Sequence, residues 1–65
     1  MKVRYDDEVD AAYIQLSSKR PKAAVEVKEG VVLHVADMDE IVGIEILHAS
    51  ERFLIRNLHT LQFMS

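Results

Sequence analysis

The stretch from Val31 to Leu47 constrains the fold of this chain more than any other feature of its sequence. It holds two segments rich in β-branched residues, which flank an acidic turn at residues 37–40. Two such segments around turn-forming residues predict an antiparallel hairpin. The hairpin contains no set of residues that performs catalysis, so it indicates an architecture and not an activity.

The length and composition of the chain predict a single domain that associates with another protein. A chain of 65 residues buries only about 60% of the surface that its unfolded form exposes. The sequence has no cysteine, which excludes disulfides and thiolate metal sites. Small domains without these supports commonly gain stability by association.

Charge and hydropathy exclude several further classes. Hydrophobic residues make up 49% of the chain, too many for a disordered segment. The net charge of −3 argues against nucleic-acid binding, which needs clustered lysine and arginine. The apolar runs are shorter than the roughly 20 residues of a membrane span, and the N-terminus lacks the apolar core of a signal peptide. We therefore expect a soluble cytoplasmic protein without nucleic-acid or membrane partners.

Alternation with a period of two predicts three strands before the hairpin, at residues 2–5, 11–16 and 23–28. The acidic residues 6–10 form the turn after the first strand, although residues 8–12 could instead form one helical turn. Residues 17–22, which include Pro21, form a loop. Gly30 allows either a tight turn or a β-bulge, and the sequence leaves both open.

The hydrophobic period changes to that of a helix from Ala49 onward. His48 or Ser50 is placed to cap this helix, Ser50 being the better residue type at a cap. The predicted fold is therefore α+β, with an antiparallel β-meander of about five strands over residues 1–47 and one C-terminal helix over about 49–63. The helix packs on one face of the sheet, and residues 1–65 form a single domain. The expected contacts of the helix are Leu54, Leu58 and Leu61 against Ile14, Leu33, Val35 and Ile44.

Four segments of the sequence resemble a known family: residues 5–6, 10–17, 29–32 and, most specifically, the stretch I-V-G-I-E-I-L-x-A-S at residues 41–50. The chain is similar to the small prokaryotic domain family of unknown function DUF2283. The resemblance implies a short bacterial or archaeal domain and provides no catalytic residue. Asp39 stands where the family often has glycine, which predicts a positive φ at this residue. His48 stands where the family often has aspartate or asparagine.

The chemically reactive side chains do not assemble into a recognisable site. Asp6, Asp7, Glu8 and Asp10 could ligate a hard cation, but they lack the spacing of a calcium loop and are typical of a turn. The basic residues of the 17–22 loop lack a glycine-rich phosphate cradle. We predict no catalytic, cofactor-binding or metal-binding residue, and no enzyme activity.

The histidines give no support for a site either. His34, His48 and His59 lack the i, i+4 spacing of a helical zinc site, and none lies beside a serine or cysteine nucleophile motif. We expect structural or solvent-exposed roles for all three.

Glu45 and Gly43 share the outer side of the last strand. Glu45 is expected to face water or a cation such as Lys2 or Arg4. Gly43 leaves room for a neighbouring large side chain such as Tyr13.

Surplus apolar surface predicts a protein-interaction module that acts as a homodimer. The interface candidates are Ile55, His59 and Phe63 on the outer side of the predicted helix, and Tyr13 and Val32 on the outer face of the sheet. The alternative is an antitoxin-like neutraliser of a small basic partner protein encoded nearby. The acidic balance of the chain motivates this second hypothesis.

Overall fold

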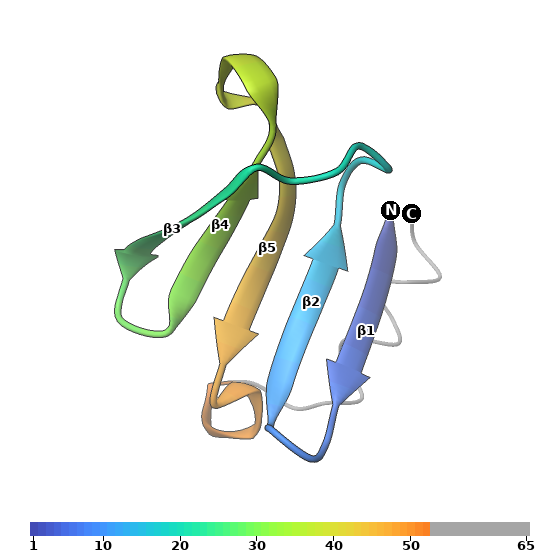
Figure 1. The fold of residues 1–65 in the computed structure, drawn as a ribbon. Helices are drawn as coiled ribbons and strands as arrows, with labels where there is room; N and C mark the ends of the chain where they lie inside the picture. Colours follow the sequence, from blue (N-terminus) through green and yellow to red (C-terminus); the bar gives the residue numbers. More distant parts are fainter. Residues whose placement is uncertain (53–65) are drawn as a thin grey trace.

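The computed structural model describes residues 1–52, which form a five-stranded antiparallel sheet (Figure 1). The strands are β1 (Lys2–Asp6), β2 (Ala11–Gln15), β3 (Ala23–Lys28), β4 (Val31–Val35) and β5 (Ile41–Leu47). Two 3-10 turns, η1 (Asp37–Asp39) and η2 (Ala49–Glu51), follow β4 and β5. The five predicted strands are confirmed, because a strand is present at each of the predicted positions.

The predicted meander is wrong, because the strands lie in the order β1-β2-β5-β4-β3. The chain leaves β2, crosses the ends of β5 and β4, and returns through β3 and β4 (Figure 1). Backbone bonds attach this crossing at both ends: the N–H of Leu16 donates to Val42 O at 2.8 Å and that of Lys22 to Val35 O at 2.7 Å. Turn signals specify only strands that are neighbours in sequence, so they did not reveal that β5 inserts beside β2.

The predicted α+β class is also wrong, because residues 1–52 contain a sheet and two 3-10 turns but no α-helix. The predicted helix start is replaced by η2. Its preceding residue, His48, adopts a left-handed conformation with φ 54° and makes no side-chain cap. Ser50 does not cap a helix either, because its backbone N–H and hydroxyl both donate to Asp10. The rest of the predicted helix lies outside the described residues.

The turns agree with the sequence predictions. Asp39 has φ 59°, which confirms the predicted positive φ, and its neighbour Met38 has φ 60°. Gly30 forms the β3–β4 turn with φ 78°, and a separate register shift between Glu26 and Lys28 marks a bulge in β3. Of the two alternatives left open for Gly30, the structure therefore has the tight turn. The β1–β2 hairpin is also confirmed, because Ala11 already pairs with Asp6.

The inner face of the sheet carries an apolar row with one residue from each strand. In sheet order, the row consists of Val3, Ile14, Ile44, Leu33 and Val25. Val3 is 6% exposed and Val25 is 48% exposed, so burial is lost from one edge of the sheet to the other. Ala49 of η2 packs with Val3 and Ala12 in the core. The core therefore lies under the β1–β2 side.

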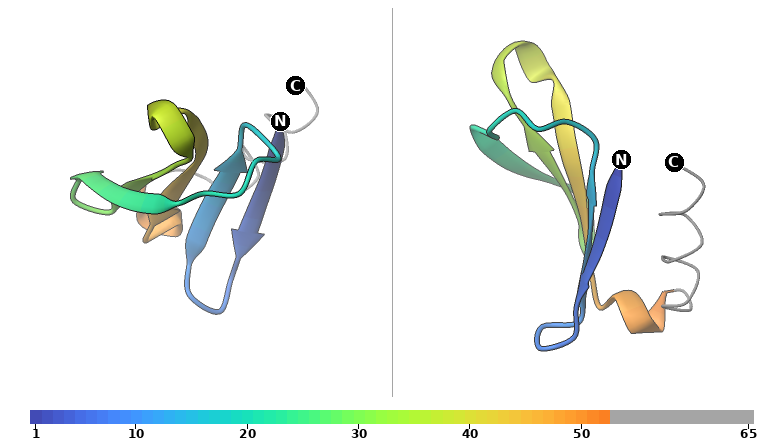
Figure 2. Two further views of the ribbon diagram at one scale, coloured as in Figure 1. Left: turned by 45° about the horizontal axis from the view of Figure 1, so that its top comes forward. Right: turned by 90° about the vertical axis from the view of Figure 1, so that its right-hand side faces the viewer.

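The sheet is strongly twisted, as its two further views show (Figure 2). Strand β3 turns well away from the plane of β1, which is the usual right-handed twist accumulated over several strands. The twist separates the two edges, and η2 lies on one side of the sheet, close to the end of the β1–β2 hairpin (Figure 2). No helix within residues 1–52 is long and apolar enough to cross a membrane.

Candidate functional site

The outer face of the sheet carries two rows of side chains that follow from the strand register. The first row consists of Arg4, Tyr13, Glu45, Val32 and Glu26. The second consists of Lys2, Gln15, Gly43, His34 and Ala24. We call these two rows the outer face. They bring together an aromatic ring, an imidazole, two carboxylates and two cations from the five strands.

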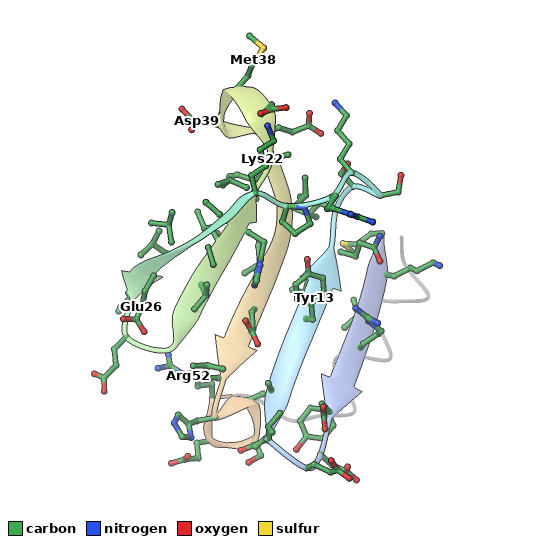
Figure 3. The ribbon with its side chains drawn as sticks, in the orientation of Figure 1. Tyr13, Lys22, Glu26, Met38, Asp39 and Arg52 are labelled. Carbon is green, nitrogen blue, oxygen red and sulfur yellow. The ribbon has the colours of Figure 1, made fainter. Side chains whose placement is uncertain are left out.

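Tyr13 is the centre of the outer face and stands over the sheet from β2 (Figure 3). Its ring lies over Gly43 so closely that a Cβ there would overlap the phenol, which confirms the predicted role of this glycine. The ring meets His34 edge-on, with 5.3 Å between centroids and 68° between planes. The Arg4 guanidinium carbon lies 5.5 Å from the Tyr13 centroid, within the range of a cation–π contact.

Glu45 pairs with His34, whereas the sequence predicted that it faces water or a cation such as Lys2 or Arg4. The His34 Nε2 atom lies 3.1 Å from Glu45 Oε1. The prediction failed because Arg4 stacks on Tyr13, while His34 lies diagonally across from Glu45 on β4. The two side chains are 22% and 34% exposed, so the pair is shielded more than a typical surface ion pair.

The outer face carries side chains that are suited to recognition. Within residues 1–52, His34 is hydrogen-bonded to Glu45 and meets the Tyr13 ring, and no serine hydroxyl is hydrogen-bonded to it. A catalytic site needs a nucleophile or reacting group within reach of its base. The outer face instead offers a stacked aromatic, a positive edge and a negative edge, which can bind and orient a partner surface.

A concavity of about 600 Å³ adjoins the outer face at the β1–β2 hairpin. Arg4, Tyr13 and Glu45 line one side of it, and the acidic residues of the hairpin turn line the other. Asp6 holds that turn, since its Oδ1 accepts from the backbone N–H of Glu8 at 3.0 Å. Residues 1–52 contain no group of three or more potential metal ligands.

Asp10 anchors the β1–β2 hairpin to η2, a role that the sequence did not reveal. The Tyr5 hydroxyl donates to its Oδ1 at 2.7 Å, and the Ser50 hydroxyl donates to its Oδ2 at 2.7 Å. The Ser50 hydrogen bond is the main cause that lowers the pKa of Asp10, and the bond to Asp10 raises the pKa of Tyr5. Asp10 and Ser50 both belong to the segments that resemble the family, and this was the one sequence feature that could have indicated their contact.

The remaining charged candidates within residues 1–52 are paired with carboxylates of the same chain. Lys19 binds Glu40 at 2.7 Å and thereby lowers the pKa of that carboxyl. Lys22 binds Asp37 at 2.6 Å, so two cations of the basic loop are paired. His48 lies 3.5 Å from Glu51, with both side chains exposed.

The predicted interface residues divide into two groups. Tyr13 and Val32 lie on the same outer row, on either side of Glu45. The helix candidates Ile55, His59 and Phe63 lie outside the described residues. The structure therefore brings the two sheet candidates onto one surface.

Comparison with known proteins identifies a family and one curated relative. Residues 2–50 match the family model described as "Protein of unknown function (DUF2283)". A protein of Methanosarcina mazei named "Putative hypoxanthine phosphoribosyltransferase" is 36% identical over 52 residues, covering 80% of this chain and 42% of that protein. The chain thus spans less than half the length of this relative. No solved structure matches the chain.

Proposed function

The chain belongs to the DUF2283 family of proteins of unknown function, and from this premise we propose that it is a non-enzymatic protein-interaction module that acts as a cytoplasmic homodimer. The observation that carries the proposal is the small size of the core. Within residues 1–52, the buried apolar side chains are Val3, Ala11, Ala12, Val42 and Ala49. No isoleucine, leucine or tyrosine in this part of the chain is buried.

Such a core provides little stabilisation for a folded monomer. Complete burial of a large apolar side chain contributes about 1.5–3 kcal/mol, and three of the five buried residues are alanines with a single methyl group. Domains below about 70 residues need additional support from disulfides, metals or association. The sequence has no cysteine, which leaves association as the most direct source of that support.

Exposed apolar side chains show that residues 1–52 leave part of their apolar surface uncovered in the single chain. Val25, Val27, Leu16 and Ile41 are each between 43% and 54% exposed. All six residues of β3 are exposed, the valines included. Apolar clusters of this kind on a small protein commonly mark an interface.

The coverage of both glycines supports a function without catalysis. A phosphoribosyl donor carries phosphate, and glycine-rich loops hold phosphate through backbone N–H groups that are open to the ligand. The chain has two glycines. The Tyr13 ring covers Gly43, and Arg52 lies so close to Gly30 that a Cβ there would stand 2.8 Å from its Nη2 atom. We therefore do not extend the name of the M. mazei relative to this chain.

The test of the proposed function is the mass of the protein in solution. Light scattering at micromolar concentration should give twice the 7.4 kDa of one chain. Dilution should shift the mass towards one chain, as expected for a reversible dimer. A mass of one chain at all accessible concentrations would contradict the homodimer.

A second candidate function is the neutralisation of a small basic partner protein. The supporting observation is the concavity beside the outer face, whose lining includes Asp6, Asp7, Glu8 and Glu45. A basic partner would bind there with strong dependence on salt, because exposed charges are screened. Titration of the purified chain with a small basic protein encoded by a neighbouring gene tests this candidate. Unchanged binding in Asp7→Asn and Glu8→Gln variants would count against it.

A further inference from the structure

We propose that the second copy of the chain docks face to face on the outer face, about a two-fold axis parallel to the strands. Arg4 of each copy then lies opposite Glu26 of the other. This inference rests on the proposed function, since it names the surface through which the homodimer forms. It follows from how charges are arranged on the outer face and from which residues a two-fold axis places opposite each other.

Charges of opposite sign lie on the two edge strands of the outer face. Lys2 and Arg4 lie on β1 at one edge, and Glu26 lies on β3 at the other edge. Arg4 and Glu26 are both exposed. The residues between them on the first row are Tyr13, Glu45 and Val32, and Glu45 is already bonded to His34. The outer face is therefore positive at one edge and negative at the other (Figure 3 labels Tyr13 and Glu26).

A closed dimer requires a surface that is complementary to itself. A two-fold axis parallel to the strands and in line with β5 reverses the strand order of the second copy. It places β1 over β3, β2 over β4, and β5 over itself. On the first row, Arg4 then faces Glu26 and Tyr13 faces Val32, each contact being made twice. Complementary charges of this kind fix the register and orientation of an interface.

The other surfaces are less suited to a second copy. The outer edge of β3 could in principle extend the sheet, but the bulge between Glu26 and Lys28 disrupts its ladder, and charged residues flank it. Bulges and edge charges are devices that prevent strand addition. The inner face carries η2, whose Ala49 packs with Val3 and Ala12. No element of residues 1–52 lies over the middle of the outer face, where Tyr13 stands (Figures 1 and 3).

The axis brings the two Glu45 side chains towards each other. Each carboxylate is hydrogen-bonded to His34 of its own copy. Asp6 is the acidic residue of β1, and the hairpin turn engages it through the backbone N–H of Glu8. The substitution Glu45→Gln removes the repulsion at the axis and keeps an oxygen for His34. It should therefore tighten the dimer by severalfold.

Charge reversal tests the predicted contact between Arg4 and Glu26. The single variants Arg4→Glu and Glu26→Arg should each raise the dimer dissociation constant at least tenfold, because each places two pairs of like charges together. The double variant restores both pairs with opposite polarity and should dimerise like the wild type. An equimolar mixture of the two single variants should form a heterodimer. Sedimentation velocity measures all four samples.

Controls separate the effect of position from that of charge and folding. Arg20→Glu and Glu8→Arg make the same changes of charge at exposed positions off the outer face and should leave the dimer unchanged. Circular dichroism checks that each variant is folded. The neutral variants Arg4→Gln and Glu26→Gln give the same answer, with smaller shifts, should a reversed variant fail to fold.

The outcomes distinguish the inference from the proposed function. A wild-type chain that remains monomeric contradicts the proposed function itself. A wild-type dimer that persists unchanged in both single variants overturns the outer-face interface and leaves the homodimer standing. Loss of the dimer in both singles without recovery in the double variant or the mixture also overturns the predicted pairing.

Discussion

The two edges of the sheet make an instructive comparison, because they begin from the same residue type. Val3 on β1 and Val25 on β3 are the two ends of the apolar row on the inner face. Val3 is 6% exposed, whereas Val25 is 48% exposed. Strand alternation places both valines on the same face, so the difference arises from what packs over each edge. The chain itself completes one edge and leaves the other open.

The two edges differ in how the segment around η2 is attached to them. At the β1–β2 end, Asp10 binds Tyr5 and Ser50, and the N–H of Ala49 donates to Asp10 O at 2.9 Å. These bonds draw η2 into the core. At the β3–β4 turn, the link to the same segment is the Arg52 side chain, whose Nη2 donates to Glu29 O at 2.7 Å. That bond holds the turn but covers no part of β3, whose residues are all exposed.

The largest effect should come from Val3→Ala at the completed edge. The substitution removes two buried carbons and leaves a cavity beside Ala12 and Ala49. The expected loss is about 1.5–3 kcal/mol in the free energy of unfolding. Urea denaturation measures it. A loss no larger than that at Val25 would show that the two edges do not differ in packing.

The next effect concerns the anchor itself and should appear as acid sensitivity. Because the pKa of Asp10 is below its ordinary value of 3.8 in the folded chain, the unfolded chain binds this proton more readily. The stabilisation is therefore complete above 3.8 and is lost as the pH falls through the lower, folded pKa. Asp10→Asn should flatten the fall of the unfolding midpoint below pH 3.8.

The control for the anchor is Glu40→Gln, at a carboxyl whose pKa Lys19 lowers on the surface. It should remove a smaller part of the acid sensitivity, because exposed ion pairs contribute little. Equal flattening by the two substitutions would mean that Asp10 acts as an ordinary surface charge. Thermal unfolding from pH 2 to 6 provides the comparison.

A smaller gain is expected from Asp39→Gly in the β4–β5 turn. Asp39 has φ 59°, a conformation that costs a non-glycine residue about 1 kcal/mol. The substitution should raise the free energy of unfolding by up to about 1 kcal/mol. Asp37→Gly, at a neighbouring position not among those with positive φ, should give no gain. An equal gain in both variants would point to charge and not to backbone strain.

The smallest effect should come from Val25→Ala at the open edge. In dilute protein, the free energy of unfolding should change by no more than about 0.5 kcal/mol, the range of surface substitutions. Comparison with Val3→Ala then measures how much the covering of one edge contributes. A cost of several kcal/mol would show that β3 is buried in solution, against its exposure in the single chain.

Sequence patterns predicted the strands because strand formation depends on the order of apolar and polar residues within a short segment. Alternation located all five segments, and the family-like position of Asp39 indicated its positive φ. The contact of Gly43 with Tyr13 was also accessible, since a glycine inside a strand suggests close approach by a neighbour. These features depend on residues that are adjacent in sequence or on one strand.

The strand order, the helix start and the partner of Glu45 were not predictable in the same way. The order depends on the pairing of β2 with β5, which are separated by two strands in the chain. The expected helix start depends on Asp10, which engages Ser50 from forty positions away. The pairing of Glu45 with His34 depends on Arg4 being held by Tyr13. Each of these three features is decided by contacts between residues far apart in sequence, and hydrophobic periodicity contains no information about such contacts.

The contact between Tyr13 and Gly43 has a consequence for how this sequence can change over time. Because the phenol occupies the space of a Cβ at position 43, any other residue fits there only if Tyr13 is first replaced by a smaller residue. Truncation of Tyr13, in turn, exposes a bare glycine in the middle of a strand, which weakens it. Each single step is unfavourable, whereas a paired exchange such as Tyr13→Thr with Gly43→Val is not. The two positions should therefore vary together among descendants of this chain, as one heritable unit.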